Sequence, residues 1–472
     1  MQATIRRIPP VLVLGFGLLL GLLLVTWLLA PRVTAVLPAS TGEPVPSTST
    51  IRIEFNRPMN PASVESHFST EPALDGRFEW DGDGMRFIPE SSWPNGGEVE
   101  ITLRAGALGE VPLPLLRTKS WTFKVGLPRI AYLWPADEKS GLYATVPGSN
   151  VGPEVLIEPA RGVIDYTLSA DGTQVLYVVV QEDGEHELRR LDLISGTDLS
   201  IHTCNPQEQC LTPALSPDGA WVTFLRQGMG IGAGGRLVLQ TSQIWVMEAD
   251  GGEPFLVSPV DHTCADPGWS PQGWLTYYDQ QLRATAMQTV DGGPAPAPFT
   301  YVPNTLGAGG SWSPEGERYL FPDIIFPDPA SAGGGTSEDS LYYSHLFQTD
   351  LSTGRSVDLS GSDDPMVEDA SPAFSPDGQW IAFARKHLDF ARWSPGRQLW
   401  QMRQDGSSAE PLTNQPNYNF SSISWSPDST LLAFIRRSPS ELEQGPEIWW
   451  LDPETGELAM LVAGGYLPTW IP

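Results

Sequence analysis

Two histidine–cysteine pairs are the first side chains in this sequence that suggest chemistry. The 472-residue chain contains three cysteines, and the segments His202-Thr203-Cys204 and His262-Thr263-Cys264 repeat one spacing, with Cys210 between them. Thiolate and imidazole groups bind zinc, but a spacing of two residues is not that of a zinc finger. We therefore expect no metal and no cofactor. We expect a disulfide, the usual state of cysteines outside the cell, either Cys204–Cys210 or Cys210–Cys264, with one thiol left over in each case.

Acidic side chains recur in a four-residue turn that the sequence repeats six times. Its cleanest copy is Ser216-Pro217-Asp218-Gly219. Proline presets the backbone of the second position and glycine supplies a positive φ at the fourth, as in a hairpin turn. A carboxylate can bind a metal or transfer a proton, yet a residue found once in each repeat most simply serves the turn. We assign that structural role, and no catalytic one, to the third positions: Asp171, Asp218, Gln272, Glu315, Asp377 and Asp428.

The elements that position these turns are β-strands. Consecutive turns begin 43 to 62 residues apart. A short apolar run precedes each turn, and an alternating strand such as residues 380–384 follows it. A third strand, such as residues 243–247, and a less regular fourth strand complete most repeats. Four antiparallel strands in each repeat predict an all-β fold, a β-propeller.

The two ends of the repeat region predict how the ring closes. Residues 129–158 contain strand patterns but lack an inner strand with its turn, whereas residues 465–472 have the pattern of an inner strand alone. Six complete repeats and one blade shared between the ends make seven blades over residues 129–472. Six blades is the second choice. A shared blade removes the free sheet edges on which other chains would pair.

The repeats resemble the WD40-like (PD40) repeats of TolB-like extracytoplasmic propellers. The resemblance rests on the aromatic-Ser-Pro-Asp-Gly turn, the Ile-Ala-Phe type of strand after it, and the Ile-Trp-x-Met-x-x-Asp-Gly pattern at residues 244–251. It implies a propeller that works outside the cytoplasm. The amino-terminal α/β domain of TolB has no counterpart here, so the partners of TolB are not carried over.

Residues 32–125 differ from the repeats and predict short strands without helices. The pattern Phe55-Asn56-Arg57-Pro58-Met59, with Phe87-Ile88-Pro89 and Thr122-Phe123 after it, resembles bacterial Ig-like domains of surface proteins. That resemblance implies a β-sandwich that serves as a spacer. Strands are expected at residues 50–55, 76–80, 85–89, 98–105 and 120–125.

The amino-terminal segment predicts a membrane anchor. Residues 11–30 carry no charge, and 20 residues of helix span about 30 Å, the thickness of a bilayer core. Arg6 and Arg7 in residues 1–10 favour a cytoplasmic amino terminus, with the rest of the chain outside the cell membrane. A cleaved signal peptide is the alternative, because Val33-Thr34-Ala35 has the small residues of a cleavage site.

Charge limits the class of partner. Lys and Arg number 28 and Asp and Glu number 56, which gives a net charge of −28. Such a chain repels phosphates, so we exclude nucleic acid and anionic lipid headgroups as main partners. We expect a monomer that binds a protein, peptide or glycan.

Long connections between second and third strands suggest where a partner binds. They lie at residues 226–242, 322–344, 385–397 and 436–446, and the antiparallel order puts them on one face. We therefore predict a binding or scaffold protein of the cell envelope. The alternative is an envelope enzyme that acts on glycans or peptides at the central pocket of the propeller. The Gly-x-Ser-x-Gly elbow of an attached hydrolase is missing from the sequence.

One aromatic position recurs at the end of the inner strands. An aromatic ring there stacks sugars in some binding sites, but packing between blades follows from the repeat alone and is the interpretation we favour. The set is Trp269, Trp312, Phe374, Trp425 and Trp470.

Overall fold

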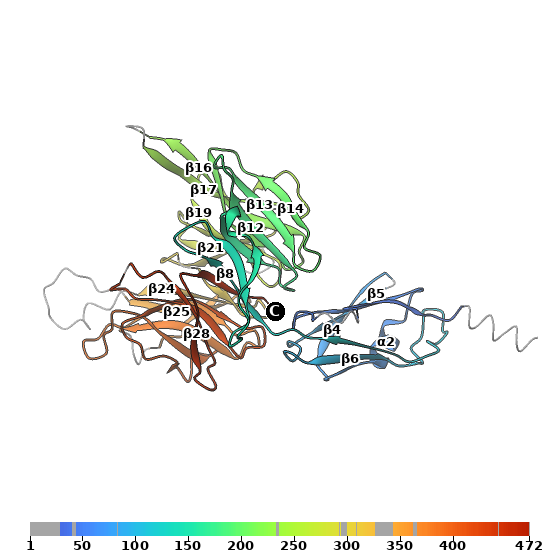
Figure 1. The fold of residues 1–472 in the computed structure, drawn as a ribbon. Coiled ribbons are helices and arrows are strands. Elements are labelled where there is room, and N and C mark those ends of the chain that lie inside the picture. The colour runs from blue at the N-terminus through green and yellow to red at the C-terminus, as the bar shows by residue number, and fades with distance from the viewer. Residues whose placement is uncertain are drawn as a thin grey trace, which may run out of the picture. The chain divides into compact units, whose positions relative to one another are not determined.

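The chain divides into two compact units, Met1–Gly126 and Leu127–Pro472 (Figure 1). The structure is a computed structural model, and it describes residues 29–39, 44–82, 84–232, 236–291, 293, 300–307, 309–325, 343–361, 366–441 and 443–471. The predicted anchor at 11–30 falls almost wholly on residues 1–28, outside this set. Within the described set, the helices are too short or too polar to cross a membrane.

The first unit is a sandwich of two antiparallel sheets. One sheet has the order β1 (Val33–Leu37), β2 (Ile51–Phe55), β5 (Gly84–Pro89), β4 (Gly76–Asp81), and the other β3 (Phe68–Glu71), β6 (Glu98–Leu103), β7 (Lys119–Lys124). Alternate residues of β2 and β6 are buried, as the period of a half-exposed strand requires. Trp93 lies fully buried between the sheets, and its indole Nε1 donates to the carbonyl of Ser49 at 2.8 Å.

The expectation of a helix-free first unit is wrong. Helix α2 (Pro61–His67) follows β2 and buries Val64 in the core. Its cap was readable in the sequence: the Asn60 side chain accepts a hydrogen bond from the backbone N–H of Ser63 at 3.0 Å, and proline occupies the first turn. Seven residues give too few turns for a visible helical period.

The described strands of the second unit form seven groups of four, which we call sheets 1 to 7. Sheets 1 to 3 comprise, in spatial order, β35 (Tyr466–Ile471), β8 (Arg129–Trp134), β9 (Gly141–Thr145) and β10 (Glu154–Ile157); β11 (Val163–Leu168), β12 (Gln174–Val180), β13 (His186–Asp192) and β14 (Asp198–Thr203); β15 (Glu208–Leu215), β16 (Trp221–Ile231), β17 (Leu237–Glu248) and β18 (Phe255–Leu256). A short 3-10 helix, Pro159–Arg161, connects sheets 1 and 2.

Sheets 4 to 7 repeat the same order. They comprise β19 (Cys264–Trp269), β20 (Leu275–Asp279), β21 (Ala284–Gln288) and β22 (Tyr301–Pro303); β23 (Ser311–Trp312), β24 (Arg318–Ile325), β25 (Tyr343–Asp350) and β26 (Arg355–Asp358); β27 (Val367–Phe374), β28 (Trp380–His387), β29 (Gln398–Arg403) and β30 (Glu410–Pro411); β31 (Asn419–Trp425), β32 (Leu432–Arg437), β33 (Glu447–Leu451) and β34 (Leu458–Ala463). One parallel bridge, Ser344 to Glu368, joins sheets 5 and 6.

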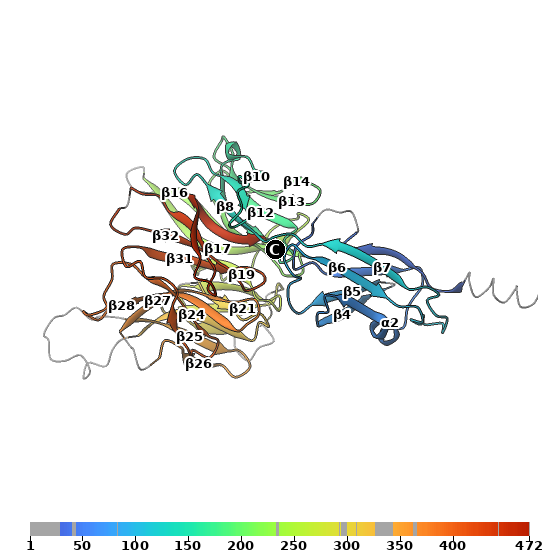
Figure 2. The ribbon, with the colours of Figure 1, turned by 60° about the horizontal axis from the view of Figure 1, so that its bottom comes forward.

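Apolar clusters between consecutive sheets arrange them in a ring. Each neighbouring pair shares one buried cluster, and sheet 7 shares one with sheet 1 through Ile448, Trp450, Tyr132 and Trp470. Figure 2 shows β31 and β32 between β28 and β8, in agreement with these clusters. A ring of four-stranded sheets packed face to face is a β-propeller.

The strand nearest the carboxyl end pairs with the first strand of the ring. Residues of β35 pair antiparallel with β8, for example Thr469 with Ala131. The Tyr166 hydroxyl of sheet 2 donates to the carbonyl of Leu467 at 2.6 Å, and the Tyr466 and Ser140 hydroxyls lie 2.9 Å apart. Sheet 1 is therefore built from both ends of the repeat region.

Candidate functional site

Five of the six turns carry an acidic residue, and each of these side chains is engaged within its own turn or hairpin. In the second turn the Ser216 hydroxyl donates to Asp218 Oδ1 at 2.6 Å and accepts the Trp221 N–H at 2.9 Å. The fourth position, Gly219, has φ +72°. Equivalent serine–carboxylate bonds hold the turns of Asp171, Asp377 and Asp428. Because these carboxylate oxygens accept local hydrogen bonds, they form part of the hairpins.

The two irregular turns make different contacts. Glu315 forms an ion pair with Arg318, three residues on. Gln272 has no charge, and its side-chain Nε2 donates to the backbone carbonyl of Glu315 at 3.1 Å. Gln272 thus links the turn of sheet 4 to that of sheet 5.

The aromatic set on the inner strands joins neighbouring sheets. The indole Nε1 of Trp269 donates to the carbonyl of Ala214 at 3.2 Å, Trp425 to that of Ala373 at 3.1 Å, and Trp470 to that of Ser424 at 3.0 Å. In each case the acceptor belongs to the inner strand of the preceding sheet. These bonds fix the rings in orientation.

A pocket of about 550 Å³ lies beside the turns of sheets 2 to 4. We call it the turn-face pocket. Aromatic rings, prolines, aliphatic side chains and two hydroxyls line it, and none of the lining side chains titrates near neutral pH: Thr167, Leu168, Ala170, Ala214, Leu215, Pro217, Trp269, Ser270, Pro271 and Trp312. Its volume and apolar lining are those of a small-ligand or peptide-segment site.

The walls of this pocket are rigid. Trp312 packs against Tyr319 with ring centroids 4.8 Å apart, and Trp269 is held by its bond to Ala214. The Ser270 hydroxyl accepts the Trp274 N–H at 3.0 Å, within a turn whose Gly273 has φ +84°. A pre-formed wall lowers the ordering cost of binding.

Two carboxylates on the inner strands are functional candidates that the sequence reasoning missed. Desolvation raises the pKa of both Asp165 in β11, which is half-buried, and Asp266 in β19, which stays exposed to solvent. Asp165 Oδ2 accepts the backbone N–H of Thr212 at 2.9 Å, which links sheets 2 and 3. Asp266 occupies a bulge with φ +49°. Neither acid belongs to the repeated turn, so no spacing singled them out.

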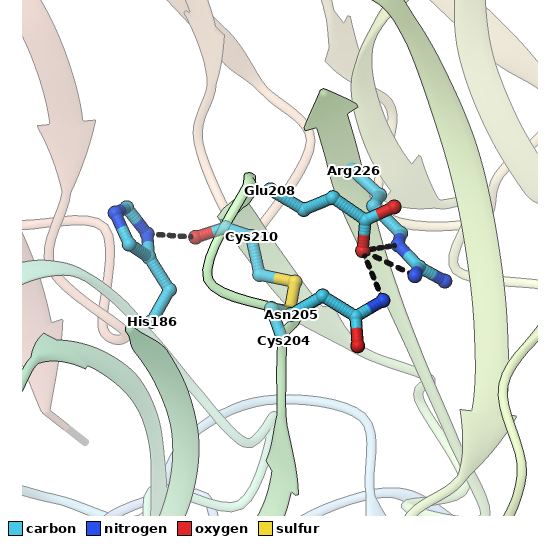
Figure 3. Close-up of a disulfide and its surroundings, with 6 residues drawn as sticks. All are labelled: His186, Cys204, Asn205, Glu208, Cys210 and Arg226. Atoms are coloured by element: carbon cyan, nitrogen blue, oxygen red, sulfur yellow. Dashed lines mark hydrogen bonds and ion pairs between the residues drawn. A yellow bond between two sulfur atoms is a disulfide. The ribbon is translucent and has the colours of Figure 1, made fainter. Parts of the chain in front are cut away.

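Cys204 and Cys210 are joined by a disulfide, and Cys264 is a free, buried thiol. Burial, with a smaller contribution from Asp279, raises the pKa of Cys264 to about 12. Figure 3 shows the disulfide closing the loop between β14 and β15, with His186 Nδ1 at 3.1 Å from the Cys210 carbonyl oxygen.

Polar side chains surround the loop that the disulfide closes. Glu208 in this loop forms an ion pair with Arg226 of β16 and accepts a hydrogen bond from the Asn205 amide at 2.8 Å (Figure 3). The guanidinium of Arg226 lies over the Trp245 ring, 4.5 Å from its centroid. The loop is therefore fixed to sheet 3 by charge and stacking as well as by the disulfide.

The two His-Thr-Cys segments do not occupy equivalent places. Cys264 begins β19 and pairs with Asp279, as Cys210 in β15 pairs with Arg226; Cys264 therefore corresponds to Cys210 and not to Cys204. His262 binds the buried Asp279 carboxylate at 2.6 Å. His202, by contrast, lies with the sulfurs of Cys204 and Cys210, and the three ligand atoms are all within 4.8 Å of one another.

The long connections between second and third strands differ in kind. Residues 226–242 are largely a hairpin: β16 and β17 stay paired to Ile231 and Leu237 and project beyond the neighbouring strands (Figure 1). The connection at 385–397 exposes Phe390 and Trp393. Residues 326–342 and residue 442 lie outside the described set. The described parts of these connections lie where the second and third strands of a sheet meet, on the side of the ring opposite the turns, which we call the long-loop face.

Comparisons with known proteins concern mainly the fold. Residues 29–125 match the family of bacterial Ig-like domains. A Bacillus subtilis (strain 168) protein named as the uncharacterized peptidase YuxL is 22% identical over 225 residues, which are 47% of this chain and 29% of that protein. The chain thus spans less than a third of the length of that relative.

Solved structures with low sequence identity are similar to the chain. A putative TolB from Agrobacterium tumefaciens is 17% identical, with 71% of this chain and 89% of that chain covered and a TM-score of 0.35. A puromycin-hydrolyzing peptidase from Mycobacterium tuberculosis is 14% identical, with 90% and 57% covered and a TM-score of 0.49. By family match, the chain has the predicted bacterial Ig-like domain, and by its own sheet order the second unit is a β-propeller.

Proposed function

We propose that this chain is a membrane-anchored, extracytoplasmic binding or scaffold protein with a seven-bladed propeller as its binding module. Residues 11–30 are the anchor, and the Ig-like domain is the spacer between membrane and propeller. The turn-face pocket is the observation that carries the proposal, because a volume of about 550 Å³ accommodates a short peptide segment or a sugar unit.

The lining of the turn-face pocket favours an uncharged ligand. Trp269 and Trp312 offer aromatic faces, Pro217 and Pro271 offer flat apolar rings, and Thr167 adds a hydroxyl that can donate or accept. Apolar faces with few polar groups recognise the CH-rich face of a sugar or an apolar or proline-containing peptide segment. A strongly anionic ligand is disfavoured by the net charge of −28.

The same lining favours binding over catalysis. General acid–base chemistry needs a group that titrates near the working pH, such as histidine or a carboxylate with a shifted pKa. The pocket's hydroxyls come from Thr167 and Ser270, and Ser270 is fully buried and accepts the Trp274 N–H. An activated serine would instead donate its proton to a neighbouring base.

Binding by the whole chain to peptide and glycan arrays tests this proposal. We expect a ligand whose affinity falls about tenfold in Trp269→Leu, because the change removes stacking worth about 0.5–1.5 kcal/mol together with part of the apolar contact area of the indole ring. Trp393→Leu is the matched control, since Trp393 is exposed on the long-loop face. A ligand whose binding is weakened only by Trp393→Leu would place the binding site on the long-loop face. A ligand whose binding is unchanged in both variants would show that neither surface is the binding site.

The proposed location has its own test. Amino-terminal sequencing of the mature protein from the membrane fraction should find the residues before Val33. A mature chain that begins at Val36 would establish cleavage after Ala35 and would remove the anchor from the proposal.

A further inference from the structure

We propose that Cys204, Cys210 and His202 form a redox-gated binding site for monovalent copper, closed in the disulfide state and open when the two thiols are reduced. The three side chains come from two neighbouring sheets. His202 lies in β14 and Cys204 follows it, while Cys210 lies in β15. The site thus spans the connection between sheets 2 and 3.

Local backbone geometry brings the three ligand atoms together. Residues two apart in an extended strand point to the same side, which puts His202 and Cys204 on one face. Cys210 returns to that face after a six-residue separation, with Cα atoms of the two cysteines 6.3 Å apart. The imidazole nitrogen and both sulfurs lie within 4.8 Å of one another. Breaking the sulfur–sulfur bond leaves two thiols beside an imidazole.

The His202 ring is held in place by packing. Its Nε2 atom is shielded from solvent and makes no hydrogen bond among the described residues. The ring packs against Phe224, with centroids 5.7 Å apart. A solvent-shielded imidazole nitrogen without a hydrogen-bond partner can donate its lone pair to a metal ion.

The number and type of ligands select copper(I) rather than zinc. Zinc sites need four ligands, whereas soft thiolates with one imidazole suit the lower coordination of copper(I). Two further donors beside the loop already have partners: Glu208 is paired with Arg226, and His186 Nδ1 bonds the Cys210 carbonyl. Apolar side chains, among them Leu188, Val222 and Phe224, surround the sulfurs. Cys204 and Cys210 are almost fully buried, which disfavours a water ligand.

The gating step is a balanced two-electron reaction. A thiol or phosphine reductant supplies two electrons, two protons are taken up, and the disulfide becomes two thiols. Copper(I) then displaces both thiol protons and binds the two sulfurs and an imidazole nitrogen of His202. A disulfide oxidant, which takes up the two electrons and two protons and is reduced to two thiols, reforms the Cys204–Cys210 bond in the metal-free site and removes two of the three ligands.

The next connection in the ring provides an internal contrast. Cys264 there faces Ser258, whose side chain hydrogen-bonds it, and the nearby His262 is engaged by Asp279. That connection has one sulfur and no free imidazole. We therefore place copper binding at the connection between sheets 2 and 3 only.

Anaerobic competition with the chromophoric copper(I) chelator bicinchoninate tests the site in the whole chain. The reduced protein should bind one copper(I) at least about tenfold more tightly than the oxidised protein, and His202→Phe should lose at least about tenfold in affinity. His262→Phe is the matched control and should bind copper(I) like the parent chain. Circular dichroism of each variant verifies that the propeller is folded.

Four results would overturn the proposal. Equal affinity of the oxidised and reduced chains would show that the thiols are not ligands. Undiminished binding in a folded Cys204→Ser, Cys210→Ser double variant would place the copper elsewhere. Unchanged affinity in folded His202→Phe would remove the imidazole from the site. Tighter binding of cobalt(II) or zinc(II), with a tetrahedral cobalt spectrum, would replace copper(I) as the cognate ion.

Discussion

At the scale of single residues, the acids of the repeated turns and the two acids of the inner strands have different environments. Asp218 and its counterparts accept hydrogen bonds within their own hairpins. Asp165 and Asp266 do not belong to the repeated turn, and partial desolvation raises the pKa of each. The regular spacing of the turn acids revealed their role in the sequence. A carboxylate whose pKa is shifted by its neighbours in the fold has no such signal, because those neighbours lie in other repeats and are not adjacent in the sequence.

We predict that Asp266→Asn stabilises the propeller at neutral pH. The folded-state pKa of Asp266 is raised above that of the unfolded chain, which is about 3.9. The free energy of unfolding therefore falls as the pH rises from about 3.9 to the folded-state pKa of Asp266. Above that pKa it stays at the lower value. Asparagine has nearly the same shape, carries no charge and tolerates the positive φ of this bulge.

Urea unfolding at pH 7 and at pH 3 measures this effect. Asp266→Asn should raise the midpoint at pH 7, and the gain over the parent chain should shrink at pH 3, where the carboxyl is protonated in both states. The exposed Asp261→Asn is the control and should change neither midpoint. A lower midpoint for Asp266→Asn at pH 7 would mean that the carboxylate has a stabilising partner.

At the scale of elements, three connections between sheets are held by a side-chain contact at the same place in the repeat. The end of the fourth strand meets the start of the next inner strand through the Cys204–Cys210 disulfide, through the Ser258–Cys264 hydrogen bond, and through the Ser360 hydroxyl, which donates to Asp369 Oδ2 at 2.6 Å. In the sequence, Cys264 matches Cys204, because both follow a His-Thr pair. The strand register aligns Cys264 with Cys210 instead.

We predict that Ser258→Cys forms a second disulfide, with Cys264. The separation of six residues equals that of Cys204 and Cys210, and the two positions already contact each other. Closing a loop of this length stabilises the fold by up to about 2 kcal/mol in the chain-entropy description. Thiol titration of the unfolded, unreduced variant should find no free thiol, and the urea midpoint should exceed that of Ser258→Ala.

Ser258→Ala is the appropriate reference because either substitution disturbs an existing contact. The Ser258 hydroxyl accepts the Ile244 N–H at 3.0 Å, and sulfur is a weaker acceptor. Two free thiols in the oxidised variant would show that the second connection differs in geometry from the first.

Element boundaries in the propeller follow the sequence pattern closely, and the exceptions have physical causes. The strand expected at 380–384 lies inside β28, and the strand expected at 243–247 lies inside β17. The hairpin of β16 and β17 extends further than expected because Gly228, Gly230 and Gly232 leave room for the side chains of Gln240 and Val238. A glycine-rich stretch looks like a loop in sequence, although glycine permits close side-chain approach in a strand.

At the scale of the whole molecule, closure of the ring joins segments more than 300 residues apart. The Trp134 indole donates to the carbonyl of Ala463 at 3.1 Å, and Tyr166 donates to that of Leu467 at 2.6 Å. The sequence predicted this closure because residues 129–158 lack an inner strand and residues 465–472 have the pattern of an inner strand alone. It did not predict the turn-face pocket, whose lining residues come from four different sheets.

We predict that a chain truncated after Gly464 loses the stability of the whole propeller. Removing β35 leaves β8 as an open edge and takes Trp470 and Ile471 out of the clusters that sheet 1 shares with sheets 7 and 2. Loss of one buried tryptophan alone costs about 3–5 kcal/mol. A propeller without its closing strand should therefore unfold at a lower urea concentration and with a shallower slope, because sheets separate from the open edge.

A chain that begins at Leu127 is the control, since it removes the separate Ig-like unit and leaves the ring intact. An unchanged midpoint after truncation at Gly464 would show that the six remaining complete sheets hold the ring together on their own.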